Sequence, residues 1–370
     1  MRISSNIKLD FDDVLIVPQR SRAASRKEVE IKRTFRFYHS PRTWCGVPIM
    51  AANMDTTGSF AMAKSLSKQN LITCLRKQYS AKELDLFFRE QTETVWRPEK
   101  IINSNVQPYQ WVSIGLHNDL KRLSEFVALQ RDTIKDFEPN ICIDIANGYT
   151  DQFVEYCNKV RNIFPQSIIM AGNICTPEMV QELILHGGVD IVKVGIGPGS
   201  VCTTRLVTGV GYPQLSAISE CAHAAHGLKS GNKRLGLICA DGGCKYPADI
   251  SKAFCANADF VMLGGMLSGT EECEGEWEYD KNNNKTSLKF YGMSSHEAQK
   301  VHSNEIAKYR ASEGRVVRVE YRGGVSTVLQ EILGGIRSCC TYIGADQIKD
   351  MAKCAEFIRT NNTHNRVFEK

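Results

Sequence analysis

The chain has 370 residues, of which 42% are hydrophobic and 24% are charged, and its formal net charge is +5. This composition supports a sizeable buried core and excludes a disordered chain. No apolar run approaches the roughly 18 residues of a membrane span, and the N-terminus lacks the apolar segment of a signal peptide. The modest charge, without a dense Lys/Arg stripe, argues against a nucleic-acid partner. We therefore expect a globular protein that stays in the cytosol and has no membrane partner.

Eight short apolar runs predict eight buried β-strands. They are Val47 to Met54, Leu71 to Leu75, Trp111 to Leu116, Ile141 to Ala146, Ile168 to Ala171, Ile191 to Val194, Leu235 to Ala240 and Phe260 to Leu263. Helical patterns lie between them, such as Thr176 to His186, where Thr176 is expected to cap the helix and Gly187 to end it. Continuous apolar runs that alternate with helices are typical of parallel strands buried on both faces. The pattern predicts an α/β fold, a (β/α)8 TIM barrel, with an open doubly wound sheet as the alternative.

Glycine and polar side chains follow most of these runs. Such clusters are Asn53-Met54-Asp55, Asp144 to Gly148, Gly172-Asn173, Gly195 to Ser200, Asp241-Gly242-Gly243 and Gly264-Gly265. Barrels bind ligands at the carboxyl ends of their strands, and often bind phosphate after the seventh and eighth strands. We therefore expect a phosphorylated ligand.

A long insertion interrupts the pattern after the eighth run. It extends from Met266 to Gly324 and contains a polar segment, Glu276 to Phe290, that resembles a hairpin, before a last helix expected at Val325 to Arg337. An insertion at the ligand end of a barrel is usually a lid or a substrate loop, and the alternative is a surface excursion.

Cys202 differs from most of the 14 cysteines, because it lies in a polar, glycine-rich loop rather than in an apolar run. The absence of any C-x-x-C spacing argues against zinc and redox-pair sites. The preceding Gly195 to Gly199 run lacks the G-x-G-x-x-G spacing of a dinucleotide fingerprint. Neighbouring hydroxyls and Arg205 would favour the thiolate, so we interpret Cys202 as a nucleophile, with a buried structural cysteine as the alternative.

Two further motifs each allow two interpretations. Asp241 either caps the helix that follows or accepts hydrogen bonds from both ribose hydroxyls of a nucleotide. The Arg310 to Gly314 segment is either part of the lid or a solvated helix end.

Several of these motifs together resemble the IMP dehydrogenase and GMP reductase superfamily, over nearly the entire chain. They are LDFDDVLIVPQRS (Leu9 to Ser21), Ala51 to Asp55, Gly197 to Arg205, Asp241 to Gly243 and Tyr291 to Ser294. Within the superfamily, Thr208 to Ala217, Tyr309 to Gly314 and Leu333 to Arg337 resemble the GMP reductases. Only about 35 residues separate Leu75 from Trp111, which leaves no room for the regulatory domains of the dehydrogenases. The insertion also offers only Tyr321-Arg322 where dehydrogenases carry an Arg-Tyr pair.

The resemblance implies a single catalytic barrel over residues 1–370, a homotetramer, and NADPH-dependent conversion of GMP to IMP and ammonia. It further implies a covalent thioimidate on the cysteine and a monovalent cation, K⁺. An IMP dehydrogenase without regulatory domains and a non-catalytic purine nucleotide binder remain alternatives.

The resemblance also implies a role for individual residues. Catalysis would use Cys202, Thr204 and Glu313. The nucleotide would contact Asp241, Gly242, Gly243, Gly264, Gly265, Gly292, Met293, Ser294, Arg310, Ala311, Ser312, Glu313 and Gly314. The cofactor would contact Ser25, Arg26, Lys77, Asp144, Ile145, Ala146, Ile196, Gly197, Met293, Tyr309, Arg310, Ser338, Cys339, Cys340 and Thr341. The cation would be held at Gly197, Gly199, Cys202 and Arg205.

Overall fold

Eight parallel strands close into a barrel in the computed structural model, which describes residues 3–21, 25–94, 109–116, 119–303 and 311–360. In chain order the strands are β4 (Ile49–Ala51), β5 (Ile72–Leu75), β6 (Gln110–Ile114), β7 (Asn140–Asp144), β8 (Ile169–Ile174), β9 (Ile191–Val194), β12 (Leu237–Asp241) and β13 (Phe260–Leu263). Each strand pairs with the next along the chain, and β13 pairs with β4 to close the circle. The predicted (β/α)8 barrel is confirmed, and the open sheet is excluded.

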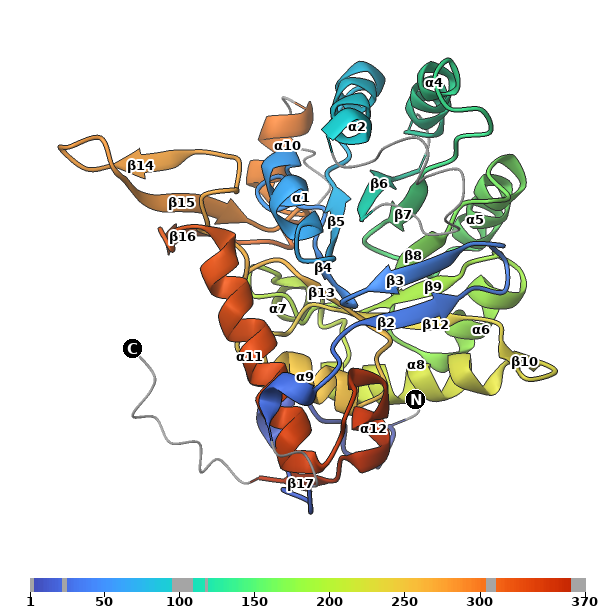
Figure 1. The fold of residues 1–370 in the computed structure, drawn as a ribbon, viewed down its shortest axis with the longest axis vertical. Coiled ribbons are helices and arrows are strands. Elements are labelled where there is room, and N and C mark those ends of the chain that lie inside the picture. The colour runs from blue at the N-terminus through green and yellow to red at the C-terminus, as the bar shows by residue number, and fades with distance from the viewer. Residues whose placement is uncertain (1–2, 22–24, 95–108, 117–118, 304–310, 361–370) are drawn as a thin grey trace.

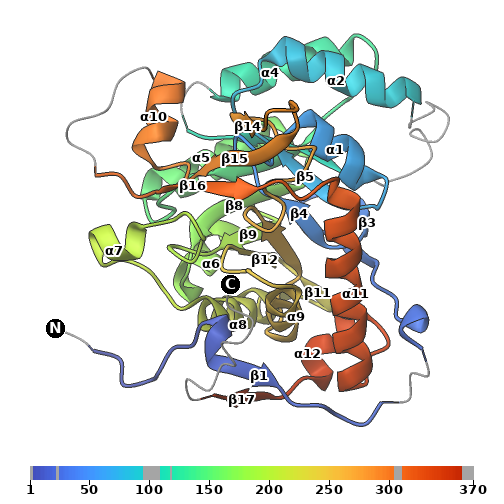
Figure 2. The same ribbon diagram turned by 90° about the vertical axis from the view of Figure 1, so that its left-hand side faces the viewer.

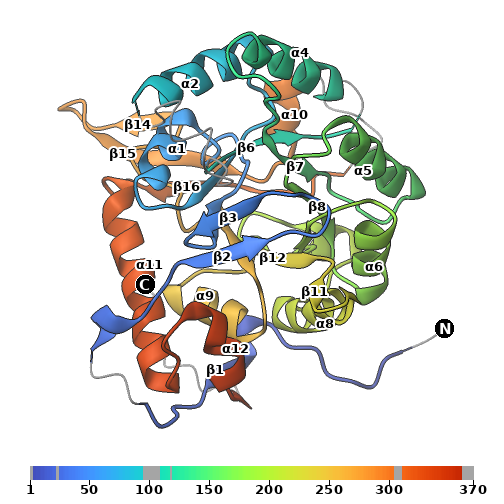
Figure 3. The same ribbon diagram turned by 45° about the vertical axis from the view of Figure 1, so that its right-hand side comes forward.

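Helices follow the strands and form the outer ring seen in Figure 3. They are α1 (Phe60–Ser67), α2 (Ala81–Thr94), α4 (Asp119–Arg131), α5 (Asp151–Ile163), α6 (Pro177–Leu185), α8 (Gln214–Gly227), α9 (Pro247–Cys255) and α11 (Val325–Ile343). A short helix, α7 (Thr204–Thr208), precedes α8, and a small hairpin of β10 (Lys229–Ser230) and β11 (Lys233–Arg234) follows it. Among the described residues, no helix is both long and apolar enough to cross a membrane.

Two predicted boundaries were wrong, and one predicted cap lacks its hydrogen bond. The pair Gly172-Asn173 lies inside β8 rather than after it, because the strand continues through a bulge until Ile174 pairs with Val194. Helix α11 continues past Arg337 to Ile343, and ends where Gly344 takes a positive φ of 72°. Thr176 stands at the N-cap of α6, but its hydroxyl makes no capping bond and instead accepts a hydrogen bond from Tyr149.

The barrel interior is closed at the amino ends of its strands by a hairpin. Strands β2 (Arg33–Arg36) and β3 (Thr43–Gly46) cross this end in Figure 3. Their Phe35 and Trp44 pack into the interior cluster with Met50, Trp111 and Phe260. Because this end is filled with aromatic side chains, a ligand can reach the interior only from the opposite end.

The insertion after β13 forms a small sheet and a helix at the open end. Strands β14 (Trp277–Tyr279), β15 (Lys285–Tyr291) and β16 (Val316–Glu320) are antiparallel, and α10 (His296–Ser303) lies between β15 and β16 in the chain. Figure 2 shows β15 and β16 crossing the barrel between α7 and α11. The predicted polar hairpin is confirmed, with Asn283 at a positive φ of 62° in its turn.

The first and last described strands pair at the end of α11 remote from this insertion. Strand β1 (Val14–Ile16) pairs with β17 (Phe357–Arg359). The same part of the chain contains helix α12 (Met351–Cys354) and three 3₁₀ turns, η1 (Phe11–Asp13), η2 (Arg26–Glu28) and η3 (Ile348–Asp350). Figure 1 shows this group at the lower end of α11.

Candidate active site

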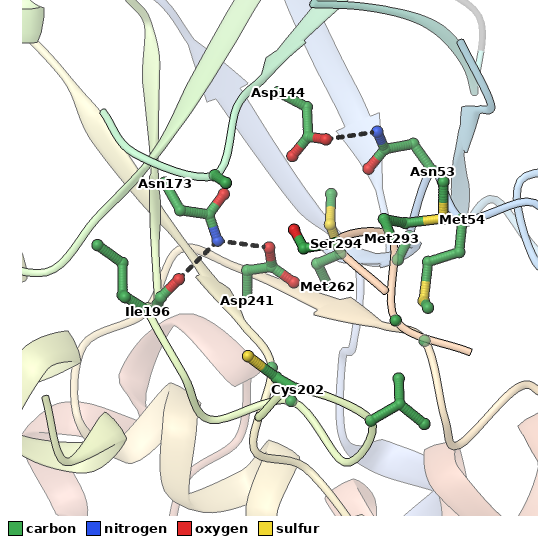
Figure 4. A pocket seen from close by; sticks show the side chains of 18 of the residues that line it. Asn53, Met54, Asp144, Asn173, Ile196, Cys202, Asp241, Met262, Met293 and Ser294 are labelled. Atoms are coloured by element: carbon green, nitrogen blue, oxygen red, sulfur yellow. Dashed lines mark hydrogen bonds between the residues drawn. The ribbon is translucent and has the colours of Figure 1, made fainter. Parts of the chain in front are cut away.

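A cavity of about 640 Å³ opens at the carboxyl ends of the barrel strands. A volume of this size is typical of a site for a small molecule. Figure 4 shows Cys202 and Asp144 at opposite ends of this space, with Asp241 between them. The predicted site residues that line it are Lys77, Asp144, Ile145, Ala146, Ile196, Gly197, Gly199, Cys202, Thr204, Asp241, Gly242, Gly243, Gly264, Gly265, Gly292, Met293, Ser294 and Glu313.

Cys202 begins a chain of hydrogen bonds that ends on a carboxylate. Its thiol donates to the Thr204 hydroxyl at 3.2 Å, and that hydroxyl donates to the Glu313 carboxylate at 2.8 Å. Cys202 lies in the loop before α7, whereas Glu313 comes from the insertion. A thiol linked through a hydroxyl to a carboxylate suits a nucleophile that works with a general acid or base. The fold therefore brings the three predicted catalytic residues together.

Backbone contacts hold the Glu313 segment against the cysteine loop. The Thr203 amide donates to the Glu313 carbonyl at 2.9 Å, and the Glu313 amide donates to the Ser294 carbonyl at 3.2 Å. A Cβ atom on Gly314 would lie 3.0 Å from the Gly292 Cα, which is tighter than most real Cβ contacts, so the neighbouring backbone would have to give way. Glycine at these two positions therefore permits the close approach of the insertion.

The neighbouring predicted residues support this segment from outside the cavity. The Ser312 hydroxyl donates to the Gly314 carbonyl at 3.0 Å and accepts from the His296 amide at 3.2 Å. Neither Ser312 nor Ala311 lines the cavity. Arg310 and Tyr309 lie outside the described residues.

Two carboxylates at strand ends share one buried lysine. Lys193, which is 2% exposed, donates to Asp144 Oδ1 at 2.6 Å and to Asp241 Oδ2 at 2.8 Å. Burial raises the pKa of the Asp144 carboxyl, but the charges of Lys193 and Lys77 outweigh it and hold this pKa below its usual range. Burial lowers the pKa of Lys193, yet the two carboxylates raise it well above the usual value. Asp144 and Lys193 are therefore both charged at neutral pH.

Asp241 is not a helix cap. The N-cap of α9 is Tyr246, and the Asp249 carboxylate accepts from its amide at 3.0 Å. Asp241 Oδ2 instead accepts from the Asn173 amide group at 2.9 Å, in addition to its bond with Lys193. Its side chain thus belongs to the cavity, as the nucleotide interpretation requires.

Glycines bring the backbone to the cavity wall beside Asp241. Gly242 and Gly243 both have a φ of +88°, a region that favours glycine. A Cβ on Gly265 would lie 2.7 Å from the Ser200 hydroxyl, and one on Gly264 would lie 2.9 Å from the Met54 sulfur. Exposed amides on such turns suit an anionic group, in accord with the expected phosphate.

The loop predicted to hold a cation packs around Arg205. A Cβ on Gly197 would lie 2.6 Å from the Arg205 Cγ, and the Gly199 carbonyl accepts from the Cys202 amide at 3.0 Å. The Arg205 guanidinium is paired with Asp10 at 2.8 Å. The Arg205 guanidinium thus faces Asp10, and its expected action on the thiol of Cys202 stays a prediction.

Those predicted cofactor residues that the structure describes lie in two separate places. One group, which includes Lys77 and Asp144, lines the cavity. The other group, Ser338, Cys339, Cys340 and Thr341, lies in α11, where the Ser338 hydroxyl donates to the Gly334 carbonyl at 3.0 Å and Cys340 is fully buried. Ser25 and Arg26 stand at η2, which packs beside α11, and this second group does not line the cavity.

Sequence reasoning missed Lys193 and Gln214. The Gln214 amide donates to the carbonyls of Val194 and Asp241 at 2.9 and 3.1 Å, and so ties the ends of two strands together. One signal for Lys193 was available, since a lysine within the apolar run Ile191 to Val194 must be buried with a partner. Gln214 begins a helix and carried no such signal.

These features define a (β/α)8-barrel protein with a cysteine-containing cavity at the carboxyl ends of its strands. Residues 8–367 match the profile of the IMP dehydrogenase / GMP reductase domain. The chain is 50% identical over 371 residues to GMP reductase of Aliivibrio salmonicida, covering 100% of each chain. It is 49% identical over 371 residues to GMP reductase 1 of Homo sapiens, covering 99% of each. The chain belongs to the IMP dehydrogenase / GMP reductase family, as its motifs predicted.

Proposed function

We propose that this chain is a GMP reductase, an NADPH-dependent oxidoreductase that converts GMP to IMP and ammonia. The observation that carries the proposal is the hydrogen-bonded chain from Cys202 through Thr204 to Glu313 inside the cavity. Relatives named GMP reductase, about half identical over their full length, support it.

In the proposed reaction Cys202 attacks C2 of the purine as a thiolate. The new S–C2 bond replaces the C2–N bond of the exocyclic amine, which leaves as ammonia with a proton supplied through Thr204 and Glu313. The product of this step is a covalent thioimidate. Bound NADPH would supply the hydride that C2 then requires. Breakage of the S–C2 bond frees IMP and returns the Cys202 thiolate.

The nucleotide would lie along the glycine turns between Asp241 and Cys202. Asp241 would accept the ribose hydroxyls, and the amides of Gly242, Gly243, Gly264 and Gly265 would bind the phosphate. Gly292, Met293 and Ser294, with the 310–314 segment, would surround the base. Of the described residues in this set, all except Ala311, Ser312 and Gly314 line the cavity.

The opposite end of the cavity fits the nicotinamide cofactor, because Lys77 and Asp144 offer a cation and a carboxylate there beside the apolar Ile145 and Ala146. Ser25, Arg26, Ser338, Cys339 and Thr341 do not line this cavity, so they would contact the same cofactor from a second copy of the chain, whereas Cys340 is fully buried within its own chain. A contribution from a second copy agrees with an oligomer such as the proposed homotetramer.

A monovalent cation such as K⁺ would be held by main-chain carbonyls of Gly197, Gly199, Cys202 and Arg205. Neutral oxygens suit such an ion. The ion pair between Arg205 and Asp10 offsets the positive charge that would otherwise oppose it.

The dehydrogenase alternative is less well supported. Tyr321 and Arg322 follow β16, and their amides donate to the carbonyls of Thr286 and Gly269 at 2.9 and 2.8 Å. Neither side chain lines the cavity, so the pair is not placed to activate water there.

We also propose that the enzyme is one catalytic barrel without a regulatory insertion. We propose that it acts in the cytosol, where its free cysteines would remain reduced.

The test is to incubate the protein with GMP and NADPH and, separately, with IMP and NAD. NADPH oxidation with one ammonia released per turnover is the expected result. NAD reduction with IMP alone would identify a dehydrogenase, and GMP binding without turnover would identify a binding protein.

A further inference from the structure

Lys193 is a charged residue in the interior of the barrel. Lys193 and Ile191 are two residues apart on β9, so their side chains point to the same side of the strand, into the barrel. The residues paired with Lys193 on the neighbouring strands are Gly172 on β8 and Cys239 on β12. A lysine is almost never fully buried unless it is paired, and this one is paired twice, with Asp144 and Asp241.

The neighbouring strand is shaped to admit this side chain. A Cβ atom on Gly172 would lie 2.7 Å from the Lys193 Cβ and 2.3 Å from its carbonyl oxygen. Glycine at position 172 therefore leaves the space that Lys193 needs.

The charges around Lys193 balance. Lys77 approaches Asp144 from the other side, at 3.2 Å from Oδ2, so two ammonium groups face two carboxylates. Because Asp144 stands on β7 and Asp241 on β12, with β8 and β9 between them, Lys193 is the direct link between the two ends of the cavity. A carboxylate at a strand end can rotate, and one that is to accept ligand hydroxyls must be held in one orientation.

We propose that Lys193 is a positioning residue for both ligands, which orients Asp241 toward the nucleotide ribose and Asp144 toward the cofactor by bonding one oxygen of each. The identity of the two ligands rests on the proposed function. A lysine that served only to neutralise buried charge would support the fold and leave the two binding steps to other groups.

The test uses Lys193→Met, which keeps the length of the side chain and removes its charge. Lys252→Met is the matched control, because Lys252 is also buried, pairs with Asp249 and the Phe11 carbonyl, and does not line the cavity. Calorimetric titration of the wild type with GMP and with NADPH comes first. If the wild type binds neither, the proposed function fails and this proposal fails with it.

We expect Lys193→Met to weaken binding of GMP and of NADPH by about tenfold or more each, the range for a lost bond between charged groups. Lys252→Met should bind both as the wild type does. Asp241→Asn should weaken GMP binding. Adding Lys193→Met to Asp241→Asn should lower the GMP affinity little further, since the residue that Lys193 positions is already changed. Equal losses in both backgrounds would show that Lys193 does not act through Asp241, and would overturn the proposal.

Lys193→Met leaves one carboxylate in excess and so could fail to fold. Lys193→Met/Asp144→Asn restores the charge balance, because Lys77 and Asp241 remain. Compared with Asp144→Asn alone, this double variant should bind GMP about tenfold more weakly. Equal GMP affinity for the two would refute the positioning of Asp241 while leaving the proposed function intact.

Discussion

The two ends of the cavity are built in different ways. At the Cys202 end, a loop after β9 meets a segment 109 residues further along the chain, and hydrogen bonds join the two, among them the one from Thr204 to Glu313. At the Asp144 end, residues of the barrel strands themselves are joined by buried ion pairs to Lys193. The comparison shows that the reactive end depends on docking of an insertion, whereas the carboxylate end depends on closure of the barrel. Changes at the first should therefore affect chemistry, and changes at the second should also affect folding.

The largest effect is expected at the reactive end. Cys202→Ala should lower turnover of GMP by on the order of a thousandfold or more, as deletion of a nucleophile does, because it removes the thiol that would form the covalent intermediate. GMP affinity and thermal stability should stay close to those of the wild type. NADPH oxidation and GMP titration measure the two quantities, and substantial remaining turnover would contradict covalent catalysis.

Glu313→Gln should separate the two half-reactions. Loss of ammonia requires a proton through Thr204 and Glu313, so steady-state GMP reduction should fall roughly a hundredfold, within the range for a lost general acid or base. Hydride transfer needs mainly alignment, so stopped-flow mixing with IMP and NADP, without ammonia, should still form up to one equivalent of NADPH. Glu320→Gln, at an exposed glutamate on β16, is the control. A burst that slows in parallel with turnover would show that Glu313 is not specific to ammonia release.

A pair of glycine substitutions should distinguish docking from folding. Gly314→Ala forces a Cβ against Gly292, and should lower turnover about tenfold with little change in melting temperature, because only the insertion shifts. Gly172→Ala forces a Cβ against the Lys193 backbone inside the barrel, and should lower the melting temperature itself. Differential scanning fluorimetry measures the melting temperature, and the NADPH assay measures turnover. A lower melting temperature for Gly314→Ala than for Gly172→Ala would contradict the prediction.

The smallest effect concerns acid stability at the carboxylate end. The pKa of Asp144 is lower in the folded protein than its unfolded value of about 3.9, so its ion pairs stabilise the fold above that pH and lose this contribution as the pH falls toward the folded pKa. The difference in free energy of unfolding between wild type and Asp144→Asn should shrink by about 1 kcal/mol between about pH 6 and about pH 3. Urea unfolding at several pH values measures it. A difference that stays constant over this pH range would contradict the prediction.

Local pattern alone determined the barrel and much of the site. The eight apolar runs predicted the eight strands because residues buried on both faces of a parallel sheet leave a continuous apolar signal. The position of Asp241 and Gly242 after such a run placed them at the ligand end, since carboxyl ends of parallel strands share one edge. Cys202 was distinguishable because its loop is polar and rich in glycine, unlike the apolar surroundings of most other cysteines.

Only the tertiary structure decided which charges meet. The pairing of Arg205 with Asp10, rather than with Cys202, joins residues 195 positions apart, and that of Lys193 with Asp241 crosses between strands 48 positions apart. The position of Ser338 to Thr341 on α11, away from the cavity, likewise depends on how that helix packs outside the barrel. Apolar residues that recur every two or 3.6 positions show which face of one strand or helix is buried. An ion pair depends on the register and closure of several elements, which no local pattern contains.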